Sequence, residues 1–334
     1  MAGVVDVSEL AENLTRDKKD YEKIFSLKMA SGFGVKPDFV VMGLNQDIDL
    51  VRDELGNITQ PGRTGTLNYT TEVIKQKYRR GTLKPFKGDI KFTEVDLYNL
   101  RTSYLGRREP GDPKDIHSLP GRTYIMGRIF GRIGKEINRT IVKGVENRAT
   151  GLAGGLNLFD GLAFKFTEGY ASKASGGVED IPLTNKVSGA AASVTPANIM
   201  AELRKVIEVI LSSEDLIEYK DENAGLWINP MWYQWIIQNL ESALSNGSQV
   251  VTVRADGRMF LNALPNTEVR PRTYMIGVDN MFWTVEGNLF YLHQDVEGDI
   301  PKMKFQEKGR DLDVLIDGEA NVDYADGRLI VLYK

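Results

Sequence analysis

The sequence predicts an α+β fold, in which helices and strands occupy separate stretches of the chain instead of alternating. Three observations lead to this prediction. Apolar residues recur at helical spacing over 125–145 and again over 199–210. From Gln249 onward the chain is instead rich in β-prone residues. Polar loops separate these blocks, and the chain contains no tandem repeat.

The amino-acid composition excludes several classes of protein and of functional site. The 334 residues are 42% hydrophobic, which is enough for a packed core. The absence of cysteine excludes disulfides, thiolate zinc sites and a cysteine nucleophile. No apolar run reaches the ~20 residues of a membrane span, and the N-terminal residues lack the order of a signal peptide. We therefore expect a cytosolic setting and no membrane partner.

Charge is distributed unevenly along the chain. The formal net charge is −4. Residues 52–148 hold 20 Lys and Arg against 11 Asp and Glu, a local charge of +9, which leaves −13 for the remainder. Such a division makes one region attractive to a polyanion, or to the acidic region of a neighbouring copy. Alternatively, salt bridges on the surface of a single copy of the chain would account for the same charge distribution.

Within the first 93 residues, we expect two segments, an arm and a hairpin, that extend from the rest of the protein. Residues 1–30 are polar and helix-prone, so we expect an arm with a short helix and little core of its own. A turn-rich stretch at 53–65 is followed by β-prone residues at 66–78 and 84–93, which we expect to pair as a hairpin. Because an isolated hairpin is marginal in water, it needs the surface of another subunit.

The stretch after Ser118 predicts one long helix. Ser118 offers an N-cap hydroxyl, and Pro120 stands where a helix tolerates proline. The helix ends near Arg148 and runs into a glycine-rich stretch at 151–161. Its apolar stripe comprises Ile125, Met126, Ile129, Phe130, Ile133, Ile137, Ile141 and Val145. A second stripe is cationic and comprises Arg128, Arg132, Lys135, Arg139 and Lys143.

Three glycines lie inside this helix: Gly127, Gly131 and Gly134. Each costs about 1 kcal/mol of helix stability relative to alanine. That cost predicts a close-packed neighbour or a local bend at each position.

Caps and alternation predict the remaining elements. Thr195 with Pro196 begins a helix over 195–211, and Asn229 begins another over 229–244. A hairpin with a three-residue turn joins 281–285 to 289–293. A short helix is expected at 94–105, and further strands at 225–229, 302–306, 312–316 and 329–333.

Candidate chemistry is sparse. His117 and His293 are the two histidines, and neither has a partner at metal-ligand spacing. The acidic stretch 295–299 lacks the calcium-loop pattern. The glycines of 151–155 follow a helix rather than opening one, which is the wrong orientation for a phosphate loop. We predict no catalytic, cofactor-binding or metal-binding residues and no enzyme activity. The aromatic group at 232–235 is expected to anchor the core or an interface.

The order of these parts resembles the major capsid proteins of tailed bacteriophages, which have the Hong Kong 97-like fold. The most specific pieces are the long helix leading into ATGLAGGLNLFDGL and the segments TPANIMAELRKVIEVI and LWINP. The resemblance implies an N-terminal arm, an extended E-loop hairpin, a P-domain containing a long spine helix, and an A-domain. It places the arm at 1–44, the E-loop at 45–93, the P-domain at 94–165 with the spine helix at 120–147, the A-domain at 166–280, and a β-rich return to the P-domain at 281–334.

This resemblance also implies a function. Such a protein would self-assemble, as pentamers and hexamers, into the icosahedral head shell of a virion that encloses double-stranded DNA. Assembly would occur in the host bacterial cytoplasm, with a separate scaffolding protein, a portal and decoration proteins as partners, without a cofactor. The basic stripe would face DNA, bound without base readout, or a neighbouring subunit. We expect no covalent cross-link.

Three alternatives stay open. An encapsulin-type compartment shares this fold and packages an enzyme cargo. A cytosolic enzyme whose catalysis used only carboxylates would need no metal-binding, cofactor-binding or nucleophile motif. Another virion component, such as a tail-tube or decoration protein, is usually dominated by strands and lacks so long a helix.

Overall fold

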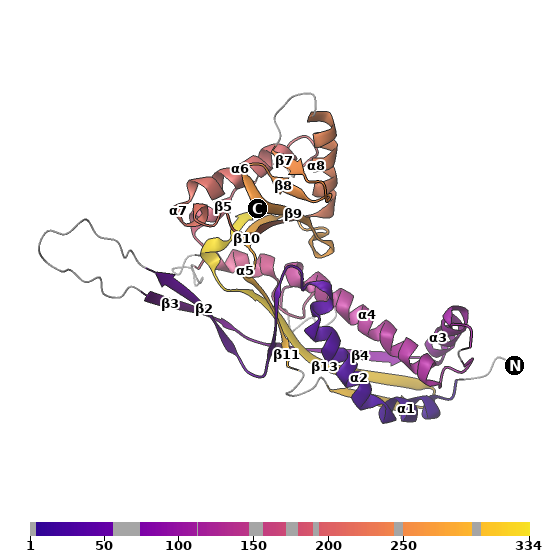
Figure 1. Ribbon diagram of the computed structural model, residues 1–334. Helices are drawn as coiled ribbons and strands as arrows, with labels where there is room; N and C mark the ends of the chain where they lie inside the picture. Colours follow the sequence, from indigo (N-terminus) through magenta and orange to yellow (C-terminus); the bar gives the residue numbers. More distant parts are fainter. Residues whose placement is uncertain are drawn as a thin grey trace, which may run out of the picture. The chain divides into compact units, whose positions relative to one another are not determined.

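The computed structural model describes residues 5–55, 74–111, 113–146, 156–171, 180–189, 194–243, 250–295 and 302–334. The chain divides into two compact units, each assembled from three separate stretches. Unit 1 comprises 1–45, 83–165 and 291–322, and unit 2 comprises 46–82, 166–290 and 323–334. Helices and strands occur in both units, as the α+β prediction requires (Figure 1).

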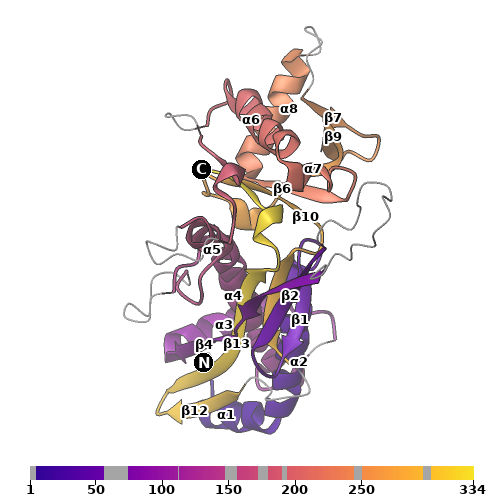
Figure 2. The ribbon, with the colours of Figure 1, turned by 90° about the vertical axis from the view of Figure 1, so that its left-hand side faces the viewer.

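Unit 1 packs helices against a five-stranded sheet (Figure 1; Figure 2). Its strand order is β1-β11-β13-β12, and β4 also pairs with β13. Ile133 of α4 lies against β4, 3.7 Å from where a Cβ of Gly88 would be. The elements are α1 (Val7–Arg16), α2 (Lys18–Ala30), β1 (Val40–Leu44), β4 (Lys84–Phe92), α3 (Glu94–Arg107), α4 (Leu119–Lys143), β11 (Leu289–Gln294), β12 (Met303–Lys308) and β13 (Asp311–Tyr324).

The longest register in this sheet joins β4 to β13. Nine antiparallel pairs run from Lys84 opposite Ala320 to Phe92 opposite Leu312. Gly318 stands opposite Phe86, and a Cβ added at Gly318 would lie 2.8 Å from the Phe86 ring. The buried Phe86 ring therefore occupies the space that a side chain at 318 would need.

Unit 2 is built on a seven-stranded sheet in the order β5-β14-β10-β6-β9-β8-β7. Helices α6 and α8 pack on it and on each other. Trp232 and Trp283 lie within this apolar core, so the prediction that the aromatic group anchors a core is confirmed at Trp232. The elements are β5 (Lys186–Val187), α6 (Ile199–Ser212), α7 (Glu214–Ile217), β6 (Ala224–Ile228), α8 (Pro230–Ala243), β7 (Val251–Val253), β8 (Met259–Leu261), β9 (Leu264–Pro271), β10 (Met281–Val285) and β14 (Val331–Tyr333).

Two strands and a short helix lie outside these two sheets and their covering helices, and short 3-10 turns lie at Gly32–Gly34, Leu183–Asn185, Thr273–Met275 and Gly327–Leu329. Strands β2 (Ile48–Leu55) and β3 (Ile74–Gly81) form a separate two-stranded antiparallel sheet in unit 2. Helix α5 (Leu162–Gly169) contains the division between the units, which falls after Lys165.

The predicted hairpin of 66–78 with 84–93 is wrong in its pairing. Strand β3 pairs with β2 over eight residues, from Ile48 opposite Gly81 to Leu55 opposite Ile74. Strand β4 instead joins the sheet of unit 1 through β13, where Phe86 is buried. Residues 56–73, which include part of the expected E-loop, lie outside the described residues.

The hairpin predicted at 281–293 is also wrong. Strand β10 pairs with β6 and β14 in unit 2, whereas β11 lies between β1 and β13 in the other sheet. Strands β10 and β11 are adjacent in sequence, but each pairs with strands that are distant in sequence. Unit 1 resumes at Tyr291, within β11, and the P-domain return expected over 281–334 stays a prediction.

Residues 7–30 are not an extended arm. They form α1 and α2, and each of these helices buries one apolar side within unit 1. Val7, Leu10, Ala11 and Leu14 recur at helical spacing, which gives α1 one apolar face. The Phe25 ring of α2 lies 5.0 Å from the Phe130 ring of α4, centroid to centroid.

The N-cap predicted at Thr195 for the helix over 195–211 is wrong by three residues. Helix α6 begins at Ile199, with Asn198 as its N-cap. The Asn198 side chain accepts a hydrogen bond from the Thr195 amide at 2.6 Å, which closes a turn before the helix. The second predicted cap is confirmed, because Asn229 Oδ1 accepts from the Met231 amide at 3.0 Å.

Candidate assembly surfaces

Helix α4 begins after the predicted N-cap Ser118, but it ends four residues before the predicted end at 147. Ser118 accepts from the Gly121 amide at its start. The last helical residue is Lys143 instead of 147, because the chain leaves the helix at Gly144. There the Gly144 carbonyl accepts from Gly161, and the Asp160 carboxylate accepts from the Glu146 amide at 2.6 Å. The predicted apolar stripe is buried except for Val145, which follows the helix and is 49% exposed.

The predicted basic stripe forms one solvent-facing side of α4, which we call the basic face: Arg128, Arg132, Lys135, Arg139 and Lys143. The first four are exposed and Lys143 is half-buried. Arg132 pairs with Glu136 at 2.6 Å, and Arg128 lies 5.9 Å from the Tyr124 ring centroid. In the part of the chain that the structure describes, Lys135, Arg139 and Lys143 have no ion-pair partner. The basic face is therefore available to another molecule.

The three helix glycines differ in their surroundings. A Cβ at Gly134 would lie 2.5 Å from the Phe33 ring, so close packing holds there. Gly127 and Gly131 are exposed, and no described atom lies within 4 Å of the Cβ position at either. Neither glycine has a close neighbour among the described residues of the chain, because both share the open side of the helix with the basic face. The local bend, the other reason given for these glycines, stays a prediction.

Close backbone packing that the sequence did not reveal occurs at the end of α4. A Cβ at Gly161 would lie 2.5 Å from the Thr140 carbonyl oxygen, and one at Gly144 would meet the Phe159 carbonyl. The glycines of this turn therefore let two backbone segments touch. The glycine cluster 151–155 itself lies outside the described residues.

Arg122 is a buried arginine of α4 that the stripe did not include. Its guanidinium contacts Asp17 Oδ2 through Nε at 3.0 Å and Nη2 at 2.5 Å, and it donates to the His117 carbonyl. Burial raises the pKa of Asp17, but hydrogen bonds and charge from Arg122 and Arg16 outweigh it, and the net pKa is lowered. This pair fastens α4 to the start of α2.

A second, partly buried arginine anchors the β2–β3 sheet within unit 2. Arg79 pairs with Asp323 at 2.6 Å and with Asp180 at 3.1 Å. Its guanidinium carbon also lies 4.1 Å from the Tyr324 ring centroid. Its side chain is 18% exposed and that of Asp323 only 5%. Burial lowers the Arg79 pKa, but the charge of Asp323 leads the opposing effects, and the net pKa is raised. We call this group the Arg79 anchor.

Both histidine rings are largely buried. His293 is buried, and its Nδ1 lies 2.7 Å from the Gln294 carbonyl oxygen. The His117 ring is largely buried beside Asp115, at 4.0 Å. Among the described ranges there is no group of three or more metal-ligating side chains. Of the acidic stretch 295–299, the structure describes Asp295 alone.

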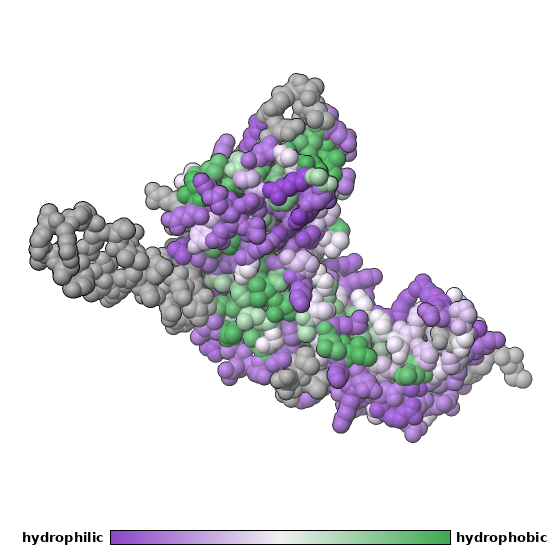
Figure 3. Space-filling view, in the orientation of Figure 1, coloured by the Kyte–Doolittle hydropathy of each residue, from purple (hydrophilic) through white to green (hydrophobic). Residues whose placement is uncertain are grey.

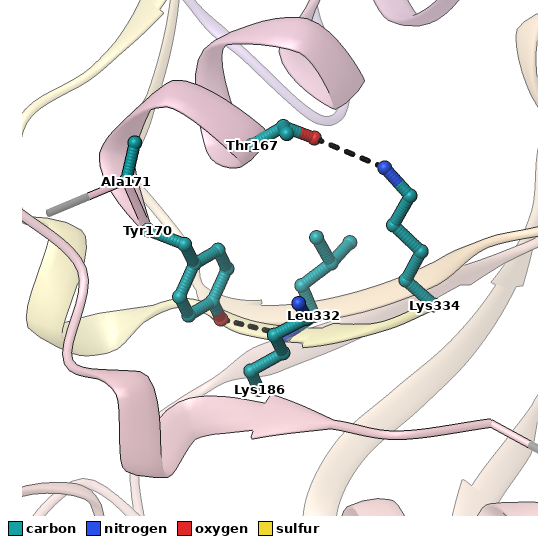
Figure 4. Close-up of a pocket in the computed structure, with 6 residues that line it drawn as sticks. All are labelled: Thr167, Tyr170, Ala171, Lys186, Leu332 and Lys334. Carbon is teal, nitrogen blue, oxygen red and sulfur yellow. Dashed lines mark hydrogen bonds between the residues drawn. The ribbon is translucent and has the colours of Figure 1, made fainter. Parts of the chain in front are cut away.

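A small hollow of about 200 Å³ opens in unit 2 (Figure 4). It is smaller than the ~300–1,000 Å³ of ordinary ligand pockets. The Tyr170 hydroxyl beside it is already satisfied, donating to the Asn185 carbonyl at 2.9 Å and accepting from the Leu332 amide at 3.2 Å. The lining residues are Thr167, Tyr170, Ala171, Lys186, Leu332 and Lys334.

The surface itself is mostly hydrophilic on the face shown in Figure 3, with apolar residues in separate patches. None of the helices described has the length and apolar composition needed to cross a bilayer.

Comparison with known proteins gives a match in fold. No family model matches the chain, and no curated protein matches it in sequence. A chain of the satellite phage P4 procapsid, whose structure includes size determination (Sid) protein, superposes with a TM-score of 0.53 at 12% identity, covering 92% of this chain and 95% of that one.

Two further capsid structures agree. A chain from the capsid of an empty GTA particle gives a TM-score of 0.50 at 13% identity, covering 90% of this chain and 88% of that one. The capsid of Myoviridae phage XM1 gives 0.50 at 11% identity, covering 90% of each chain. The chain therefore has the fold of these phage and particle capsid proteins, as the resemblance in its sequence implied.

Proposed function

We propose that this chain is the major capsid protein of a tailed phage and assembles into an icosahedral head shell around double-stranded DNA. The observation that carries the proposal is the completeness of the fold match. It covers 92% of this chain and 95% of the procapsid chain, so no large part of either stands outside the shared fold. The matched chain belongs to a procapsid, and we extend that role to this protein.

The two units would then take the two domain roles of such a shell protein. Unit 1, with α4 as the spine helix, would be the P-domain, and the α6–α8 region of unit 2 would be the A-domain. Strands β2 and β3 would be the base of the E-loop. The Arg79 anchor supports this role, because a limb that binds a neighbouring copy must be fixed firmly where it leaves its own.

The basic face of α4 would bind carboxylates of a neighbouring copy. Three exposed acidic residues of unit 2, Glu218, Asp221 and Glu222, have no ion-pair partner in the described part of the chain. The alternative partner is the phosphate backbone of packaged DNA, bound without base readout. A net charge of −4 per copy favours the first arrangement.

Partners beyond the chain itself follow from the same proposal. Copies would gather as pentamers and hexamers, guided by a separate scaffolding protein, with a portal and decoration proteins added. The mature location would be the virion, after assembly in the host bacterial cytoplasm.

Electron microscopy of the expressed protein tests the proposal. We expect closed shells, open sheets or rings of five or six copies. A monodisperse monomer in sedimentation at every protein concentration and salt condition would contradict it. Nuclease-protected DNA in particles from infected cells distinguishes a phage head from an encapsulin, which would instead retain a protein cargo.

A further inference from the structure

Helix α3 presents an apolar row to solvent. Val95, Tyr98 and Leu105 are 67%, 49% and 38% exposed. The opposite side of the helix is held in unit 1 by Leu97 and Tyr104, which are buried. The exposed row is therefore not needed to pack α3 against its own unit.

The spacing of this row suits a second helix. Val95, Tyr98, Thr102 and Leu105 are separated by three, four and three residues, as are the core positions of a pair of packed helices. The Thr102 hydroxyl donates to the Tyr98 carbonyl at 3.0 Å, so it is satisfied without a partner. We call these four residues the α3 seam.

The charges of helix α3 change sign from its first turn to its last. Glu94 stands at the N-terminal end, where it pairs with Arg310 at 3.1 Å and stays 45% exposed. Asp96 also stands in the first turn of α3, and Arg107 stands in its last turn. A second helix laid antiparallel would bring the acidic first turn of each copy near the basic last turn of the other, whereas a parallel helix would place like-charged ends together.

We propose that the α3 seam binds the α3 seam of a second copy, antiparallel, about a two-fold axis. In such an isologous contact position 95 meets position 105 of the partner, and the reverse. The proposal rests on the proposed function, within which this contact would join one ring of copies to the next.

The seam would be a weak contact by itself. Helix α3 has 14 residues and is therefore about 21 Å long. One such contact buries less than the roughly 1,200 Å² of a stable independent interface. Its contribution would come from repetition across the shell.

Cysteine pairing tests the seam directly, because the chain has no native thiol. Val95→Cys and Leu105→Cys are made as separate chains, mixed before assembly and oxidised. The antiparallel seam brings these unlike positions within the ~4 Å Cβ separation of a disulfide. Like positions lie about 15 Å apart along the helix. We expect a disulfide dimer from the mixture and none from either chain alone.

Other results would overturn the proposal. A dimer from Val95→Cys alone would mean parallel pairing, and a mixture without dimer would mean no seam. Electron microscopy of the same samples distinguishes failure of the α3 seam from failure of the proposed function. If shells form without the disulfide dimer, the seam is rejected and the proposed function is still supported. If the dimer forms without shells, the seam is supported and the proposed function is rejected.

A matched pair of variants guards against misfolding. Tyr98→Glu and Ser103→Glu both place a carboxylate at an exposed position of α3, but only the first lies in the seam. Both should leave the unfolding midpoint unchanged. Added to both cysteine chains, Tyr98→Glu should lower dimer yield by about tenfold, because a lone charge resists burial, and Ser103→Glu should not. Equal yields would overturn the seam.

Discussion

Gly131 and Gly134 show how position within one helix decides what a glycine does. Gly134 faces the ring of Phe33, a residue with a φ of +48° whose carbonyl is held by Asn138 at 3.1 Å. That ring cannot withdraw easily. Gly131 faces open space, so its absent side chain leaves only the entropic cost of glycine in a helix.

Alanine at these two positions should therefore have opposite effects. Gly134→Ala should lower the free energy of unfolding by about 1–3 kcal/mol through overpacking. Gly131→Ala should raise it by about 0.5–1 kcal/mol through helix propensity. Urea denaturation of unassembled protein measures both. If Gly134→Ala proved as stable as Gly131→Ala, the contact with Phe33 would not exist in solution.

His293 should make stability depend on pH. Burial lowers its pKa below the ordinary ~6.5, against the Gln294 carbonyl and the charge of Asp295. The folded chain then binds fewer protons than the unfolded one, so this contribution is complete above about pH 6.5 and is lost as pH falls through the folded-state pKa. His293→Gln should flatten the slope of unfolding free energy between about pH 7.5 and 5.5. Parallel curves for the two proteins would contradict this.

Some of these residue roles could be predicted from the sequence. Arg122 stands four residues before Met126 on the apolar side of α4, and that position alone indicates a buried, paired arginine. Arg79 gave no such signal. Its partners Asp180 and Asp323 are 101 and 244 positions away, and no local pattern joins them.

At the scale of elements, local signals located strands but not their partners. Residues 84–92 alternate as predicted, yet β4 pairs with β13, more than two hundred positions later. Strands β10 and β11 stand three residues apart and enter different sheets. Side-chain alternation identifies the two faces of a strand, and it carries no information about which edge it pairs with.

The Arg79 anchor offers a test beside a natural control. Arg79→Ala would leave the Asp323 carboxylate buried without its cation, a change that typically costs about 3–5 kcal/mol. The neighbouring Arg80 is 70% exposed and pairs with Asp47 at 3.1 Å, so Arg80→Ala should cost less than about 1 kcal/mol. Thermal unfolding of both variants measures the difference. Similar melting temperatures would show that the anchor does not hold the strands.

The basic face can be tested without leaving a carboxylate unpaired in the chain. Lys135→Gln with Arg139→Gln removes two cations that lack a described ion-pair partner. If the face meets a neighbouring copy, this double variant should block shell formation, because acidic partners lose their cations. If it meets DNA, shells should still form but should retain less DNA, with strong salt dependence.

The control for this experiment changes the same charge elsewhere. Lys19→Gln with Lys23→Gln alters two exposed residues of α2. It should leave assembly and DNA retention as in the unmodified protein. Equal loss in both double variants would mean that total charge matters and that the basic face has no specific role.

For the whole molecule, assembly should depend on residues 56–73 more than folding does. Leu55 and Ile74 are a paired register position, so an Asn-Gly turn can join the two strands in place of that segment. The shortened chain should unfold at the same temperature as the full chain, since the described core is intact. It should form no shells if this segment binds a neighbouring copy. Normal shells would exclude the E-loop role.

The β4–β13 register has a consequence for how this chain can change over generations. One residue inserted just before Phe86 would shift every later side chain of β4 to the opposite face and remove Phe86 from Gly318. Point substitutions can be absorbed one at a time, but a single-residue length change here alters a whole strand at once. Insertions and deletions in descendants of this sequence should therefore collect in its loops, while 84–92 and 312–320 keep their lengths together.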